Sequence, residues 1–349
     1  MTPADLVSAF CSWCEGPGFK RPGTARAYLA SLTAFLREMK VEDLETVTPR
    51  AVDEFVARCQ LEGMTVGTIR ARMFAMRAFW KWATSRGHLA RDPMALVRVP
   101  PEEEGQRHVL VLDASERARL FAAALEQVPV QGKNERDEFF ARRLATTVGQ
   151  AERDYALLTT IYAAALRCGE AAALEWTDLI GPDKRDGLLG LIVRRSKKSS
   201  VPSKPIYLGK EATAAILRWR SAARASGRYG RRIFGLTPSG ISDAFSRCAR
   251  AAGVAKKYGR NVTPHCLRAS RATAASRAGL SEDAVRDLLR HSGTDSILRY
   301  VKAADEGTRR FEQVASLDHP ELVGARRGRI AARLEKAGSF AGRRTRAGR

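Results

Sequence analysis

The most informative stretch of this chain reads Thr263-Pro264-His265-Cys266-Leu267-Arg268. Threonine is a good N-cap and proline suits the first helical position, so a helix is expected to begin at Pro264. His265 then lies in the first turn, and Arg268 follows three residues later on the same face. A histidine and an arginine together at a helix N-terminus are suited to binding a phosphate group.

Three further segments carry residues of the same chemistry. They are Leu166-Arg167-Cys168-Gly169-Glu170 at a predicted helix end, Lys197 in a predicted hairpin turn, and Leu289-Arg290-His291-Ser292-Gly293 followed by Tyr300. Taken singly, each histidine would more often be structural. The joint spacing is the stronger signal, because His291 stands 23 residues after Arg268 and nine before Tyr300.

These segments resemble the tyrosine recombinase, or phage integrase, family and its Xer-like two-domain site-specific recombinases. The residues in family order are Arg167, Lys197, His265, Arg268, His291 and Tyr300. The stretches Thr68–Arg72 and Gly87–Met94 resemble the family's helical core-binding domain, and the likeness covers about residues 5–305. The family usually has glycine immediately before the second histidine, where this chain has Arg290. That turn is therefore either reshaped or supplied with a left-handed residue by Gly293.

The resemblance implies a metal-independent DNA strand transferase. Tyr300 would attack the phosphodiester and form a 3′-phosphotyrosyl bond, which conserves the energy of the broken bond. Arg167 and Arg268 would bind the nonbridging oxygens and stabilise the charge that develops at phosphorus. With this fixed positive charge no cofactor and no metal is expected, and the sequence shows no acidic cluster of the two-metal type.

The same resemblance assigns the proton transfers. Lys197 would protonate the leaving 5′ hydroxyl, with Lys198 as its rival in the same turn. His265 would act as general acid or base near the tyrosine, and His291 would hydrogen-bond the scissile phosphate. Glu170, three residues after the arginine of its segment, either orients that arginine or faces solvent.

Hydrophobic patterning predicts a mainly α fold with a small β-hairpin or sheet in the catalytic domain. We expect a helical core-binding domain over 1–100, a linker over 101–110, an α+β catalytic domain over 111–319 and a basic tail over 320–349. The linker is marked by Pro100-Pro101-Glu102-Glu103-Glu104-Gly105. Apolar spacing predicts helices from Thr24, from Thr48-Pro49 and around 69–83, and then over 152–166, 210–226, 239–252, 264–278, 281–290 and 294–302. Leu188–Val193 and Val201–Leu208 are expected to be paired strands.

The charge of the chain favours a polyanionic partner. There are 60 Lys and Arg against 38 Asp and Glu, a net charge of +22 and a pI near 10.4. Each neutralised phosphate releases counterions, so DNA is the leading partner. One face of the helix around 69–83 carries Arg70, Arg72, Arg77 and Lys81, which either contact the DNA backbone or form a solvated face.

We therefore expect a site-specific recombinase that exchanges strands through a Holliday junction. Its expected partners are double-stranded DNA with inverted half-sites, a homodimer on one site and a homotetramer in synapsis. No apolar run reaches the length of a membrane span and the N-terminus carries no signal peptide, so a cytoplasmic, nucleoid-associated protein is expected. The alternatives are relaxation of DNA in the manner of a type IB topoisomerase, or a catalytically silent DNA-binding protein. Residues 306–322 are expected to contact a neighbouring protomer, and the sequence leaves integration, excision and resolution open.

Overall fold

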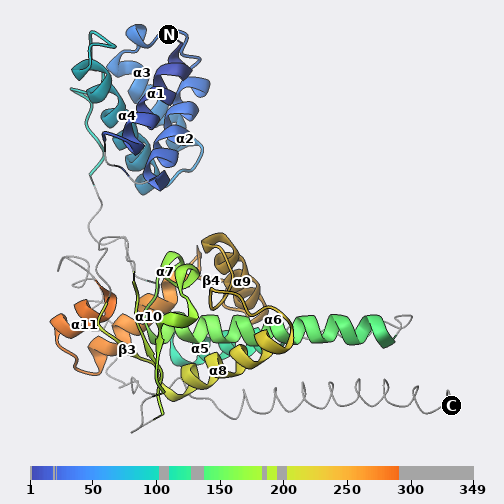
Figure 1. The fold of residues 1–349 in the computed structure, drawn as a ribbon. Helices are drawn as coiled ribbons and strands as arrows, with labels where there is room; N and C mark the ends of the chain where they lie inside the picture. The colour runs from blue at the N-terminus through green and yellow to red at the C-terminus, as the bar shows by residue number, and fades with distance from the viewer. Residues whose placement is uncertain are drawn as a thin grey trace, which may run out of the picture. The chain divides into compact units, whose positions relative to one another are not determined.

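Packed helices form the first unit of the computed structural model, residues Met1–Arg107 (Figure 1). They are α1 (Pro3–Glu15), α2 (Pro22–Glu38), α3 (Pro49–Leu61) and α4 (Val66–Ser85), with a short 3-10 helix, η1 (Leu44–Thr46). Thr48 caps α3 by accepting a hydrogen bond from the amide of Ala51, and Pro49 takes the first helical position. Aromatic side chains from several helices meet in the core: Phe10, Phe35, Phe55, Phe79 and Trp80.

The structure describes residues 2–18, 20, 22–101, 110–126, 137–182, 187–194 and 203–290, without the side chains of 137–145. The chain divides after Arg107, within the segment 101–110 expected to be the linker, and the second unit is His108–Arg349. Several predictions lie outside the described residues: the helix over 294–302, the protomer contact over 306–322, the tail over 320–349, and the positions of Lys197, Lys198, His291, Gly293 and Tyr300.

The long helix α6 (Asp137–Ala163) is the centre of the second unit (Figure 1). Helices α5 (Ala114–Glu126), α8 (Lys210–Ala225) and α10 (Pro264–Arg277) pack against it. The other helices are α7 (Cys168–Ala173), η2 (Trp176–Asp178), α9 (Pro238–Ala251) and α11 (Glu282–Leu289). The fully buried side chains of this core include Leu120, Leu158, Ile161, Ile216 and Phe245.

A small antiparallel sheet stands beside these helices, in the order β1-β2-β3. The strands are β1 (Leu179–Ile180), β2 (Gly190–Leu191) and β3 (Ile206–Tyr207), with Leu191 paired to both neighbours. A second hairpin joins β4 (Lys256–Lys257) to β5 (Arg260–Asn261) just before α10. The predicted pairing of 188–193 with 201–208 and the mainly α fold class are confirmed. The sequence did not indicate β1, β4 or β5, because two-residue strands leave no alternating pattern.

A separate cluster of small apolar side chains joins α10 and α11 to the end of α6. Its buried members are Ala165, Ala269, Ala272, Ala275, Val285 and Leu289. Alanines let helix backbones approach closely, so this cluster brings α10 and the C-terminal end of α11 to the corner between α6 and α7. The arginines of the candidate site come from these three places.

Candidate active site

The corner between α6 and α7 positions Arg167. Two residues after the end of α6, Ala165 is left-handed at φ 46°, and the amide of Leu166 donates to the carbonyl of Ile161 at 3.0 Å. This bonding closes the end of the helix although a left-handed alanine costs roughly 1 kcal/mol. Arg167 then occupies the N-cap of α7, with its side chain one quarter exposed.

Glu170 lies at the centre of the site, with a side chain only 3% exposed. Its Oε1 accepts a hydrogen bond from Nη1 of Arg167 at 2.7 Å, and its Oε2 accepts one from the Arg167 amide at 3.0 Å. The same Oε2 accepts from Nη2 of Arg290 at 2.8 Å and lies 3.8 Å from Nη1 of Arg268. Of the two roles that the sequence left open for Glu170, the structure supports orientation of Arg167.

One carboxylate therefore faces three guanidinium groups. Burial alone would raise the pKa of Glu170, but the charges of Arg290 and Arg268 and the hydrogen bonds from Arg167 outweigh it, so its pKa is lowered. Glu170 is therefore ionised at neutral pH. Its single negative charge leaves the cluster with an excess of positive charge, which suits an incoming phosphate.

Helix α10 supplies the histidine of the site. Thr263 occupies the N-cap position and Pro264 the first turn, as the sequence predicts. The Thr263 hydroxyl does not cap a backbone amide; instead the Thr263 amide donates to Sγ of Cys266 at 3.4 Å, and the hydroxyl lies 4.0 Å from the same sulfur. His265 is exposed on the first turn. Desolvation lowers its pKa, and the positive charges of Arg268 and Arg167 lower it further, so the ring is neutral near pH 7.

Arg268 points inward from α10. Its side chain is fully buried, and its two terminal nitrogens donate to the carbonyls of Ala165 and Leu289. Arg268 therefore joins the end of α6 to the end of α11. The sequence placed it on one helical face with His265. The structure directs its guanidinium into the buried cluster around Glu170.

The end of α11 brings an arginine that sequence reasoning had treated only as a departure from the family. Arg290 is itself left-handed, at φ 52° and ψ 44°, and follows the last residue of the helix, Leu289. The sequence predicted either a reshaped turn or a left-handed residue at Gly293, which lies outside the described residues; the structure instead has the left-handed residue at Arg290, in the position of the family's usual glycine. Its side chain turns back into the molecule and is 8% exposed. Its polar partners are the carbonyls of Ala164, Ala165 and Leu288 and the carboxylate of Glu170.

The structure thus brings together Arg167, His265 and Arg268 from the predicted set. The turn expected to hold Lys197 lies between β2 and β3, and His291 follows Arg290 directly in the chain. The spacing Arg167-x-x-Glu170 at a helix start was the available signal for the ion pair. No signal in the sequence could have joined Arg290 to Glu170, because 120 residues separate them.

Comparison with known proteins identifies the family of the chain. The phage integrase family matches residues 139–306, and the N-terminal SAM-like domain of phage integrases matches residues 20–87. The chain belongs to the phage integrase family. The matched residues include Arg167, the 263–268 stretch and Tyr300, so the predicted family is confirmed.

Relatives of this integrase family resemble the chain over most of its length. Tyrosine recombinase XerC of Xanthomonas axonopodis pv. citri is 29% identical over 282 residues, which cover 76% of this chain and 81% of the relative. A lambda integrase dimer bound to a COC′ core site has a TM-score of 0.67 at 17% identity, covering 89% of this chain and 99% of that one. A lambda integrase tetramer bound to a Holliday junction has a TM-score of 0.66 at 17% identity, covering 89% and 80%. The two structures support the fold.

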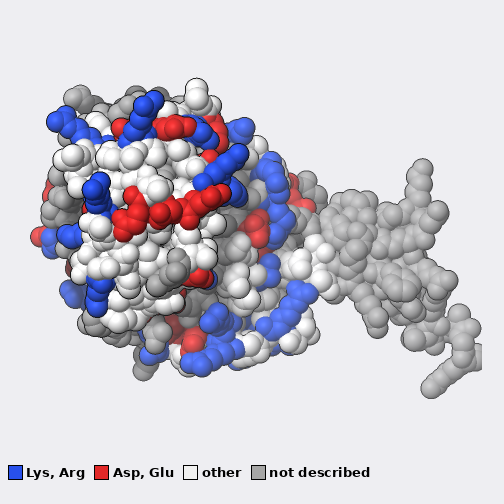
Figure 2. Space-filling view, turned by 90° about the horizontal axis from the view of Figure 1, so that it is seen from above, with Lys and Arg blue, Asp and Glu red and all other residues white. Residues whose placement is uncertain are grey.

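In the N-terminal unit of this integrase, the arginines of α4 have partners within the chain. Arg70 donates to the carbonyl of Pro100, and Arg77 donates to that of Val97 at 2.7 Å. Arg72 donates to Sγ of Cys59 at 3.4 Å and lies 5.6 Å from the centre of the Phe55 ring. Lys81 is exposed. Acidic side chains lie among the basic ones on the face shown in Figure 2.

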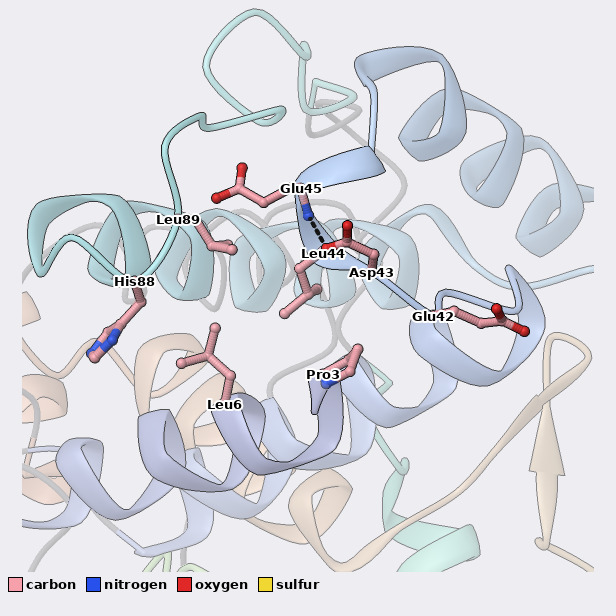
Figure 3. Close-up of a pocket in the computed structure, with 8 residues that line it drawn as sticks. All are labelled: Pro3, Leu6, Glu42, Asp43, Leu44, Glu45, His88 and Leu89. Atoms are coloured by element: carbon pink, nitrogen blue, oxygen red, sulfur yellow. Dashed lines mark hydrogen bonds between the residues drawn. The ribbon is translucent and has the colours of Figure 1, made fainter. Parts of the chain in front are cut away.

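A cavity of about 240 Å³ in the N-terminal unit does not suit DNA (Figure 3). It is lined by Pro3, Leu6, Glu42, Asp43, Leu44, Glu45, His88 and Leu89. Its carboxylates would repel a phosphate. Two of them are already bound to backbone amides: Asp43 accepts from the amide of Glu45 at 2.9 Å, and Glu45 accepts from the amide of Ala90 at 2.8 Å. Among the described residues, no group of three or more His, Cys, Asp or Glu could hold a metal ion. No helix in the described part of the chain is long and apolar enough to cross a membrane.

Proposed function

We propose that this tyrosine site-specific recombinase cleaves and rejoins DNA through a 3′-phosphotyrosyl bond to Tyr300 and exchanges strands through a Holliday junction. The observation that carries the proposal is the cluster around Glu170. The buried carboxylate of Glu170 holds a partly exposed Arg167, and the charges of Arg268 and Arg167 act on an exposed, neutral His265. This arrangement is suited to a phosphodiester, which needs neutralisation of charge and a group that transfers protons.

Each described side chain takes a distinct part in this reaction. Arg167 binds the nonbridging oxygens, because its guanidinium reaches the surface while Glu170 fixes its direction. Arg268 contributes its positive charge from within and keeps the ends of α6 and α11 together. His265 is neutral near pH 7, so its ring can accept a proton and later return it.

The remaining parts belong to residues outside the described ones. Tyr300 is the nucleophile, Lys197 protonates the leaving 5′ oxygen, and His291 hydrogen-bonds the scissile phosphate. Chain connectivity supports these assignments: Lys197 lies in the connection between β2 and β3, and His291 is the residue after Arg290. No metal or other cofactor is needed, because the phosphotyrosyl bond conserves the energy of the broken phosphodiester.

The partner is double-stranded DNA with inverted half-sites. One protomer would bind each half-site, so that a homodimer occupies one site and a homotetramer forms the synapse. The dimer on a core site and the tetramer on a Holliday junction among the structural neighbours support this stoichiometry. The net charge of +22 supports a site of action on the nucleoid in the cytoplasm.

Covalent trapping tests the proposal. The full-length protein is incubated in EDTA with nicked duplexes tiled across the DNA that flanks its own gene. Covalent protein–DNA adducts, which survive SDS and are removed by protease, are compared for wild type, Tyr300→Phe and Tyr258→Phe. Tyr258 is the matched control, because it is an 81% exposed tyrosine of the same unit. Loss of the adduct in Tyr300→Phe alone supports the assignment.

Other outcomes have definite meanings. An adduct that survives Tyr300→Phe overturns the choice of nucleophile. Tight DNA binding without any adduct favours a catalytically silent family member. If the adduct forms, joining of two labelled duplexes distinguishes a recombinase from an enzyme that only relaxes supercoils, as a type IB topoisomerase does.

A further inference from the structure

Arg290 is held in a backbone conformation that its side chain does not favour. The residue follows α11 at φ 52°, in the left-handed region where glycine is the ordinary choice. Glycine is also usual at this position in the family that the sequence resembles. A left-handed arginine persists only where the surrounding structure over-determines it, so its side-chain contacts need an explanation.

The Arg290 side chain joins two parts of the site. Nη1 donates to the carbonyl of Ala164 at 3.0 Å and to that of Leu288 at 2.9 Å. Nη2 donates to the carbonyl of Ala165 and to Oε2 of Glu170, both at 2.8 Å. The guanidinium therefore ties the end of α11 to the corner from which Arg167 projects. With 8% of the side chain exposed, it faces the protein rather than a DNA phosphate.

Arg290 also changes the electrostatics of Arg167. Glu170 divides its one negative charge between the two guanidinium groups, with Oε1 on Arg167 and Oε2 on Arg290. Without Arg290, the full charge of the buried carboxylate would act on Arg167 and Arg268. Arg167 would be held more strongly by Glu170 and would bind an incoming phosphate less well.

We propose that Arg290 is a positioning residue: it shares the charge of Glu170, so that Arg167 stays available to the scissile phosphate, and fixes the end of α11 next to His291. This inference rests on the proposed function, because the phosphate is the ligand of that same site. At this turn a glycine would allow the left-handed backbone but make no side-chain contact, whereas Arg290 joins the end of α11 to Ala164, Ala165 and Glu170.

The test removes the Arg290 side chain and keeps the left-handed backbone of the turn. Arg290→Gly suits the left-handed backbone, so the loss is confined to the side chain. Single-turnover adduct formation is measured with the full-length protein at saturating nicked duplex, and binding is measured separately. Arg286→Ala is the matched control: Arg286 lies one turn earlier on α11 and pairs with Asp283 at 2.6 Å.

We expect Arg290→Gly to slow adduct formation by about tenfold or more with a much smaller loss of DNA affinity, because the scissile phosphate is one of many backbone contacts, while Arg286→Ala retains the wild-type rate. Millimolar guanidinium should restore part of the rate in Arg290→Gly and leave wild type unaffected. Arg290→Lys should fall between the two, because lysine keeps the charge without the planar fork. A rate for Arg290→Gly within about twofold of wild type overturns the proposal. So does an equal loss of rate and affinity, which would mean direct DNA contact.

A second measurement separates this inference from failure of the proposed function. If no duplex yields an adduct with wild type, stabilisation by inorganic phosphate is measured as the rise in Tm at constant ionic strength. Arg167→Ala defines the part of that rise that belongs to the site. Loss of this part in Arg290→Gly supports positioning. The positioning role is overturned if Arg290→Gly keeps the full rise in Tm. It is also overturned if the rise in Tm with phosphate is the same in wild type and Arg167→Ala.

Discussion

The arginines of α4 and the arginines around Glu170 look alike in sequence and differ in the structure. Arg77 of α4 binds the carbonyl of Val97, and Arg70 binds that of Pro100, so each fixes the segment that follows α4 within the same unit. Arg167, Arg268 and Arg290 instead share one buried carboxylate. The difference lies in how the charges are grouped: three guanidinium charges meet one carboxylate around Glu170 and Arg167 stays one quarter exposed, whereas Arg70 and Arg77 each bind a single backbone carbonyl.

The largest expected effect is on catalysis. Arg167→Ala removes the guanidinium that reaches the phosphate and should slow adduct formation by roughly 10²–10³-fold. Arg77→Ala removes an equal charge from α4 and should leave the single-turnover rate at saturating DNA unchanged. Trapping with the nicked duplex that gives the strongest wild-type adduct measures both. A comparable loss of rate in Arg77→Ala would remove the distinction between the two groups of arginines.

The next effect is on stability. Glu170→Gln keeps the shape of the side chain but leaves a buried positive cluster without its counter-charge, which should lower the free energy of unfolding by about 3 kcal/mol. The corresponding carboxylate near α4 is Glu38, which lies 3.8 Å from Arg72 and 3.5 Å from the exposed Arg37. Glu38→Gln should cost less than about 1 kcal/mol.

Hydrogen exchange of amides in α10 and α4 during urea unfolding reports the two units separately. Glu170→Gln should weaken protection in α10 and leave α4 unchanged. Equal losses for the two substitutions would mean that the charge shared at Glu170 has no special stabilising role.

A smaller effect should appear with pH. The pKa of Glu170 is lowered in the folded protein, so its stabilisation is complete above the unfolded value of about 4.3 and is lost as pH falls through the folded pKa. Wild type should therefore lose stability in this acid range more steeply than Glu170→Gln, whose side chain does not titrate. Parallel pH profiles of unfolding free energy for the two proteins would contradict the shift.

The sequence predicted much of this site because its signals are local. The Thr263-Pro264 start of α10, the Thr48-Pro49 start of α3 and the spacing of Arg167 to Glu170 each lie within one turn of chain. Helix starts follow from capping chemistry, and a carboxylate three residues from an arginine is close in any helix. Fold class and family were predictable for the same reason.

The direction of each guanidinium could not be predicted. Arg268 shares a helical face with His265 in any projection, yet its nitrogens reach the carbonyls of Ala165 and Leu289, which belong to other elements. In the sequence, the basic residues of α4 form an unpaired basic face. The partner of Arg77, the carbonyl of Val97, comes close only when the chain after α4 folds back. Pairings over 20 or 100 residues depend on tertiary packing and leave no periodic pattern.

The smallest expected effect distinguishes the residues of α4 from one another. Arg77→Gln loses one charged hydrogen bond to the Val97 carbonyl and should lower the free energy of unfolding by about 1.5 kcal/mol. Its guanidinium is engaged, so the salt dependence of DNA binding should not change. Lys81 is exposed on the same helix, so Lys81→Gln should leave stability unchanged and reduce the slope of log K against log salt by about 1.

Titrations of a 30-base-pair duplex at several salt concentrations, with urea unfolding of each variant, measure both quantities. The reverse pattern, a reduced slope for Arg77→Gln and none for Lys81→Gln, would mean that the carbonyl bond is exchanged for a phosphate when DNA binds. The arginines of α4 would then resemble those around Glu170, because both groups would exchange contacts within the protein for contacts with a DNA phosphate.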